Sequence, residues 1–417
     1  MSKNVIHRIY RPAIFYFVVV LITGTWLRVQ WTWPELTFLN AKFLIHAHSH
    51  LALLGWIFPV VAGYLISNFV LPTRQKSLAS LLYWIPIHIC IIAMTFAFAL
   101  QGYAFWSISF STIYILVTSI WSIHFLLKMD DRNDPTSLLV KLAVFSYLGS
   151  NIGPFALSGG TLYGESWITL WITYYLHSQF SLWIPLGVLA ILFSLFKESL
   201  NSVHDAKTNR HLKISKFMIW AYFVGSIMQL ETMSRTLSIF NASPYIGFLG
   251  SIVVLVTTFY LVFLLFHKNK PPYIILTGLL LFLIKSILQL LASIPEIGQS
   301  FTEIHFFKIG YTHLLLLGSY TFILIGVLEK LNTKTLQNKV GLHINGENNS
   351  NEVTNPGTSI LKSTGTIIFM VGSLSMIFLL MTIGFSQYVG IILDFNIQFY
   401  LFLTGMISLV GFVASLR

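Results

Sequence analysis

Histidine is the residue type in this sequence that carries the strongest chemical signal. The chain has 13 histidines, and six of them gather near one end of long apolar segments. Neutral imidazole is the commonest metal ligand in proteins, and ionisable groups inside a membrane indicate a functional site by default. These histidines therefore indicate a bound metal or metal-containing cofactor, with simple bridging of helices as the alternative. They are His46, His48, His50, His177, His305 and His313.

The spacing of these histidines places three of them at one depth. His50, His177 and His313 lie on three different apolar segments that run in the same direction. At a rise of about 1.5 Å per residue, all three fall in the outer third of a bilayer. His46 and His50 are four residues apart and share one helix face, whereas His48 points away from that face.

Two of the segments also resemble each other. His50 precedes Gly55 by five residues, and His313 precedes Gly318 by the same interval, with leucine-rich sequence between. A glycine below a ligand lets a flat macrocycle or a partner helix approach closely. Two histidines at one depth on facing helices would suit both axial positions of a haem iron.

The composition shows which elements must position these side chains. Of the 417 residues, 55% are hydrophobic and only 9% are charged, against about a quarter charged in soluble domains. This excludes a soluble enzyme, a disordered chain and a fibrous repeat, and it predicts an all-α integral membrane protein. The single cysteine, Cys90, excludes a disulfide framework and a cysteine-rich metal site.

The hydropathy pattern predicts about twelve membrane-spanning helices in a single membrane domain over residues 1–417. Residues 330–363 are polar and are predicted to form a flexible cytoplasmic loop. The twelve predicted spans are 13–31, 43–69, 79–101, 104–127, 138–159, 167–196, 216–234, 244–266, 272–294, 304–328, 365–384 and 396–415.

The distribution of charge accounts for the net charge of +11. Most basic residues, such as Arg11, Arg74 and Lys216, fall in segments on the same side as the N-terminus. The positive-inside rule then places both termini in the cytoplasm. The basicity is explained by topology, so the lipid bilayer is the implied partner and no nucleic acid is expected.

Twelve spans with histidines on spans 2, 6 and 10 resemble subunit I of the haem–copper oxidases, in particular the C-type and nitric-oxide-reductase branch. The segments that carry the resemblance are His46-Ala47-His48-Ser49-His50-Leu51-Ala52-Leu53-Leu54-Gly55-Trp56 and Tyr311-Thr312-His313-Leu314-Leu315-Leu316-Leu317-Gly318. The resemblance implies a twelve-helix bundle in a bacterial inner membrane. It also implies a low-spin haem held by His313 and a span 2 histidine, namely His50 or else His46 or His48.

The sequence departs from that family where the second haem and the copper would bind. Tyr311 stands where the family has the ligand of its high-spin haem, and span 7 lacks the expected histidine pair. His177 matches one copper ligand and, together with Glu231, would hold a non-haem iron or copper ion. Glu231 pairing with Arg235 is the alternative. The resemblance therefore implies the fold and one haem, without a complete haem–copper centre.

Three further cations lie near or within the spans. Arg28 and Arg235 end spans 1 and 7 and would pair with haem propionates, with an interfacial position as the alternative. Lys285 lies in the middle of span 9, with Gln289 one turn away, where it would be part of a proton path.

Three functions remain open from the sequence. The first is electron transfer, or oxygen or nitric oxide chemistry, by a haem protein; an electron donor would be a separate subunit or carrier because no Cys-x-x-Cys-His motif is present. The second is a transporter or metal- or haem-handling protein that uses the outward histidine cluster. The third is a cofactor-free structural subunit on the same scaffold.

Overall fold

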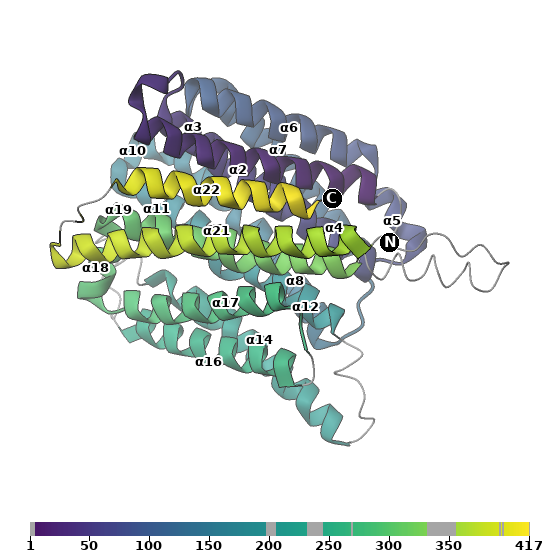
Figure 1. Cartoon of the computed structure of the whole chain (residues 1–417). Helices are drawn as coiled ribbons and strands as arrows, with labels where there is room; N and C mark the ends of the chain where they lie inside the picture. The colour runs from purple at the N-terminus through teal and green to yellow at the C-terminus, as the bar shows by residue number, and fades with distance from the viewer. Residues whose placement is uncertain are drawn as a thin grey trace.

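The computed structural model describes residues 5–196, 206–231, 245–267, 270–331, 356–391, 393 and 396–416. Within this part of the chain the protein is a bundle of helices without β-strands (Figure 1). Eleven of the described helices are long and apolar enough to cross a membrane. The prediction of an all-α membrane protein is therefore confirmed.

The first six of these spans agree closely with the predicted boundaries, apart from an earlier start of the first. They are Ile6–Thr32 (η1 Ile6–Tyr10, α2 Arg11–Thr32), Ala41–Phe69 (α3 Ala41–His50, η3 Leu51–Ile57, α4 Phe58–Phe69), Leu81–Gln101 (α6), Phe105–Lys128 (α7), Pro135–Ala156 (α8 Pro135–Ser150, α9 Ile152–Ala156) and Glu165–Leu195 (α11 Glu165–His177, η5 Ser178–Trp183, α12 Ile184–Leu195).

The other five spans lie in the C-terminal part of the bundle. They are Tyr245–Phe266 (in α16, Tyr245–His267), Tyr273–Ala292 (α17), His305–Leu331 (α19 His305–His313, η6 Leu314–Tyr320), Ser363–Val389 (in α21, Pro356–Val389) and Ile397–Ser415 (α22). Short helices connect the spans; these are η2 (Pro34–Leu36), α5 (Pro72–Leu78), η4 (Leu157–Gly159), α10 (Gly160–Tyr163) and α18 (Pro295–Glu303).

The predicted seventh span corresponds to α14, Ala206–Met228, which is not among the eleven apolar spans. Its first half contains Lys207, Arg210, Lys213 and Lys216, and these residues lower its hydropathy. We keep the numbering of the twelve predicted spans, so α14 is span 7 and His305–Leu331 is span 10.

The predicted loop 330–363 is wrong at its C-terminal end. Residues 356–363 form the beginning of α21, which starts at Pro356. Proline is well tolerated in the first turn of a helix because its missing N–H would have no partner there. Residues 332–355 lie outside the described residues.

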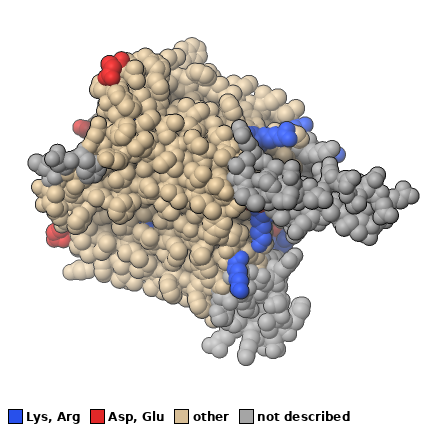
Figure 2. All heavy atoms as spheres, in the orientation of Figure 1, with Lys and Arg blue, Asp and Glu red and all other residues tan. Residues whose placement is uncertain are grey.

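The two termini lie at the same end of the bundle, which we call the terminal end (Figure 1). Lysine and arginine side chains gather at this end, and acidic side chains are visible at the opposite, far end (Figure 2). Arg74 and Lys76 on α5 belong to the terminal end, whereas Glu35 and Glu165 follow odd-numbered spans and belong to the far end. This polarity is the one expected of a membrane protein with asymmetric loops.

Spans 2, 6 and 10 form the centre of the bundle and share an unusual local structure. In their most apolar 18-residue stretches, 83%, 83% and 67% of the residues are buried, against 33–56% in the other apolar spans. Each contains a π-helical segment that begins directly after a histidine, namely η3 after His50, η5 after His177 and η6 after His313. Such segments inside α-helices are frequent at functional sites.

Tyrosine side chains from neighbouring helices donate hydrogen bonds to carbonyl groups of two of these π segments, η3 and η5. Tyr114 donates to the Leu54 carbonyl at 3.0 Å, Tyr222 to that of Ser181 at 3.0 Å, and Tyr320 to that of Phe180 at 2.7 Å. In a membrane interior an unsatisfied carbonyl would cost several kcal/mol. The buried tyrosines therefore stabilise the irregular backbone that follows His50 and His177.

Candidate functional site

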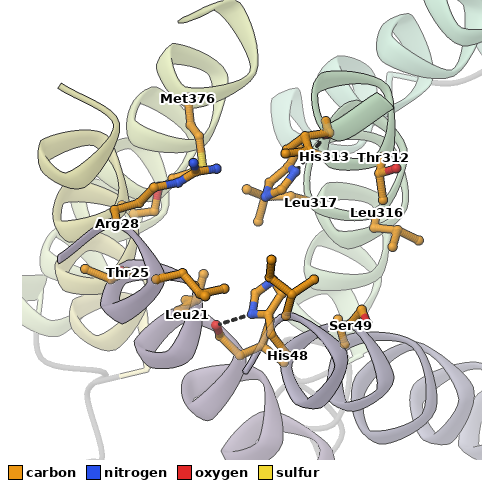
Figure 3. A pocket seen from close by; sticks show the side chains of 18 of the residues that line it. Leu21, Thr25, Arg28, His48, Ser49, Thr312, His313, Leu316, Leu317 and Met376 are labelled. Carbon is orange, nitrogen blue, oxygen red and sulfur yellow. Dashed lines mark hydrogen bonds between the residues drawn. The ribbon is translucent and has the colours of Figure 1, made fainter. Parts of the chain in front are cut away.

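A cavity of about 650 Å³ lies near the far end, between spans 1, 2, 10, 11 and 12. Its walls are mainly apolar and include Leu21, Leu27, Ile309, Leu316 and Leu317. Figure 3 shows side chains from helices far apart in the sequence around one open space. The volume is that of a site for a cofactor-sized ligand, because such pockets hold about 300–1,000 Å³.

His48 on α3 presents its ring to this cavity. Its Nδ1 lies 3.1 Å from the Val20 carbonyl oxygen and 3.1 Å from Thr23 Oγ1, both on span 1. A carbonyl oxygen can only accept, so Nδ1 carries the proton and donates it. The neutral ring then has its lone pair on Nε2, which is the arrangement that fixes a histidine as a metal ligand.

His313 is the last residue of α19 and lines the same cavity from span 10 (Figure 3). Its Nδ1 donates to the Ile309 carbonyl, 2.9 Å away and one turn earlier on the same helix. This bond again assigns the lone pair to Nε2. The structure therefore brings His48 and His313 to one apolar cavity with the same ring nitrogen available in each.

Gly24 allows span 1 to approach His48. A Cβ atom built on Gly24 would lie 2.9 Å from His48 Cε1, closer than real Cβ contacts allow. Only glycine leaves this space. Gly24 and Thr23 could not be predicted as site residues, since nothing in their spacing connects span 1 to a histidine 24 or 25 residues later.

Arg28 places a cation in the cavity wall. Its side chain is buried, with 5% of the residue exposed, and points into the open space (Figure 3). Its guanidinium lies over the Trp31 ring, 5.0 Å from the centroid. No acidic side chain pairs with Arg28 in the part of the chain that the structure describes. The position is buried rather than interfacial, and it suits an anionic group of a ligand.

His50 and His46 differ from His48 in their surroundings. The His50 ring stacks on Phe98 with centroids 4.2 Å apart, and its Nδ1 donates to the His46 carbonyl at 2.8 Å. His50 does not line the cavity, whereas His46 does and packs beside Tyr103. Among the three predicted span 2 candidates, His46 and His48 line the cavity with His313, and of these two His48 has its Nδ1 bonded to a backbone carbonyl.

His305 and Lys308 line the mouth of the cavity, and both are exposed. Ser49 on span 2 and Leu176 on span 6 are also exposed and complete this rim. Of these four exposed residues, His305 and Lys308 lie in the first turns of span 10, at the far end.

The predicted metal ligands His177 and Glu231 lie apart from this cavity. His177 is buried, and its Nε2 lies 2.7 Å from the Ser226 carbonyl oxygen. The Glu231 carboxylate accepts a hydrogen bond from the Gly247 N–H at 3.1 Å. The described residues contain no group of three or more histidine, cysteine or acidic side chains arranged to hold a metal ion. Arg235 lies outside the described residues.

The glycines predicted to admit a macrocycle contact other helices instead. A Cβ on Gly55 would meet Leu51, Ile91 and Tyr16, and a Cβ on Gly318 would meet Leu281 and Ile377. At both positions, therefore, the glycine allows close approach of a neighbouring helix, which was the alternative to a macrocycle.

No protein-family model matches the chain, and no curated protein matches it.

Proposed function

We propose that this chain is a membrane haem protein that holds one haem between His48 and His313 and transfers electrons through it. The observation that carries the proposal is that both rings reach one cofactor-sized apolar cavity with Nδ1 bonded to a backbone carbonyl. When bound, a haem supplies reversible one-electron redox chemistry. The sequence resemblance to subunit I of the haem–copper oxidases supports the same assignment.

The chain's own residues fit such a group at three points. His48 and His313 supply two neutral nitrogen donors, which suit iron. The leucine and isoleucine walls exclude water from the macrocycle faces. Arg28 offers a cation with no protein partner among the described residues, and a propionate carboxylate would neutralise it.

The proposal also includes the orientation of the protein in the membrane. With the terminal end in the cytoplasm of a bacterial cell, the cavity lies near the outer face of the inner membrane. A separate donor subunit or carrier would then deliver electrons at the far end, where the cavity mouth is exposed. Oxygen or nitric oxide turnover is not part of the proposal, because the described residues offer no complete second metal site.

The test is a reduced-minus-oxidised optical spectrum of the purified protein, with the haem quantified as its pyridine haemochrome. We expect sharp low-spin bands at one haem per chain. Absence of haem after expression with haem supplied would refute the proposal. Stoichiometric metal without haem would favour the alternative of a metal-handling protein, and two haems per chain would contradict the single-site assignment.

A further inference from the structure

A second group of buried polar side chains lies away from the cavity, in the middle of the bundle. Lys285 on α17 is completely buried. Its Nζ has no hydrogen-bond partner within the described ranges, and it lies over the Phe282 ring, 5.5 Å from the ring centroid. A buried ammonium group without any partner is costly, so its presence requires an explanation.

His177 on span 6 has the complementary property. Its Nε2 must donate to the Ser226 carbonyl, because a carbonyl oxygen cannot donate. The neutral ring therefore carries its lone pair on Nδ1. That atom is buried and has no hydrogen-bond partner in the part of the chain described. The ring is thus an unused acceptor, whereas Lys285 is an unused donor.

The contacts between the two helices bring these atoms into one region. Gln289 follows Lys285 by one helical turn, and its Nε2 donates to Ser181 Oγ at 2.9 Å. Ser181 in turn follows His177 by four residues in the π segment η5. The face of α17 that carries Lys285 therefore packs on the segment that carries His177.

We propose that water molecules bind here and bridge Lys285 Nζ to His177 Nδ1. A water molecule is both donor and acceptor, so it would satisfy the lysine through its oxygen and the imidazole through a hydrogen. Buried waters in proteins occupy such positions, between polar groups that lack other partners. A metal ion fits the same place poorly, because the neighbouring ammonium group repels a cation and Nε2 is already bonded to Ser226.

This water site is independent of the haem proposal, and radiolytic labelling tests it directly. A short X-ray pulse in ¹⁸O-labelled water converts bound water into hydroxyl radicals that label the nearest side chains. Phe282 lies under Nζ and is 3% exposed, and Phe58, 1% exposed, is a matched buried control. In the intact protein we expect Phe282 to be labelled several-fold faster than Phe58.

Two variants locate the water. Lys285→Met replaces the ammonium group with an apolar chain of similar length, and we expect the fast labelling of Phe282 to be lost. His177→Leu removes the acceptor and should reduce the same label if Lys285→Met fails to fold. Equal labelling of Phe282 and Phe58 in the wild type would overturn the proposal. So would unchanged labelling in the variants, or stoichiometric copper or iron that His177→Leu removes.

Discussion

His313 and His177 each end a regular helix just before a π segment, yet the protein uses opposite nitrogens of their rings. In His313, as in His48, Nδ1 is bonded to a backbone carbonyl and Nε2 is left for the cavity. In His177, Nε2 is bonded to the Ser226 carbonyl and Nδ1 is left in the buried interior. The same residue on the same kind of backbone thus has two different environments.

The partners around each ring explain the difference. The rings of His48 and His313 face a cavity of about 650 Å³ with apolar walls and one buried guanidinium, that of Arg28. The ring of His177 is buried next to carbonyls that accept hydrogen bonds from Tyr222 and Tyr320, and the helix that carries Lys285 packs there through Gln289. We therefore propose a metal-containing ligand for the first region and water for the second, although both regions share the same local motif.

The largest expected effect is the loss of the low-spin haem bands, which we expect from histidine variants in the first region and not in the second. His48→Ala and His313→Ala would each remove one of the two nitrogen donors that we propose for the haem, so we expect the low-spin bands to be lost in both. His50→Ala and His177→Ala should keep these bands, because neither ring reaches the cavity. The measurement is the reduced-minus-oxidised spectrum at equal protein concentration.

His50→Ala is the sharpest control in this set, since it lies two residues from His48 on the same helix. If the low-spin bands survive His48→Ala but vanish in His50→Ala, the span 2 ligand of the haem is His50 and not His48. Bands that depend on His177 would show that the second region also binds a cofactor, and the contrast between the regions would fail.

Much of the architecture follows from the sequence because hydropathy and helix length determine it. Span 2 was predicted at 43–69 and is observed at Ala41–Phe69. The choice among His46, His48 and His50 could not be made in the same way. Helical spacing separates His48 from the other two, but the packing of span 1, with Gly24 against the ring, decides which face meets span 10.

The π segments are the other feature that periodicity could not reveal. One extra residue per turn after His313 shifts every later side chain of span 10, including Tyr320, which bonds span 6. Their carbonyl partners come from residues distant in sequence, such as Tyr114 for Leu54. Tertiary contacts of this kind leave no local pattern in the sequence, so hydropathy predicts the span but not its π segment.

A second prediction concerns the space beside His48. Gly24→Ala places a methyl group 2.9 Å from Cε1 of a ring that two hydrogen bonds hold, so the ring must move. Overpacking of this kind costs about 1–3 kcal/mol, which corresponds to a roughly 5- to 150-fold loss of haem affinity. Haem titration of the apo-protein measures it.

The control for this prediction is Gly187→Ala on span 6, where the new methyl group would lie 3.2 Å from Val61; neither residue lines the cavity. Both changes replace a helical glycine, so they share any gain in helix propensity. Equal haem affinity in the two variants would show that the position of the His48 ring is not restricted by span 1.

The third prediction concerns Arg28, the buried cation in the cavity wall. Arg28→Met keeps the length of the side chain but removes the guanidinium, and with it the proposed partner of a propionate. We expect haem affinity to fall by roughly 1.5–3 kcal/mol. The reduction potential should also fall, because a nearby cation favours the reduced, more negative haem. Potentiometric titration that shows no shift would remove Arg28 from the site.

The smallest expected effect comes from Thr23, which accepts a hydrogen bond from His48 Nδ1 while its own proton goes to the Val19 or Val20 carbonyl. Thr23→Val removes this acceptor and leaves the Val20 carbonyl as the remaining partner of the ring. A single neutral hydrogen bond contributes about 0.5–1.5 kcal/mol, so haem affinity should fall only a few-fold.

The reduction potential distinguishes a ligand effect from simple loss of stability in this variant. A hydrogen bond to Nδ1 makes the imidazole a stronger donor to a metal, so its removal should raise the potential slightly. Thr32→Val on the same helix removes a similar bond, to the Arg28 carbonyl at 2.8 Å, without touching His48. If both variants leave the potential unchanged, the Thr23 contact positions the helix rather than the ring. If only Thr23→Val raises it, His48 is the ligand, since no other cavity histidine bonds to Thr23 in the described structure.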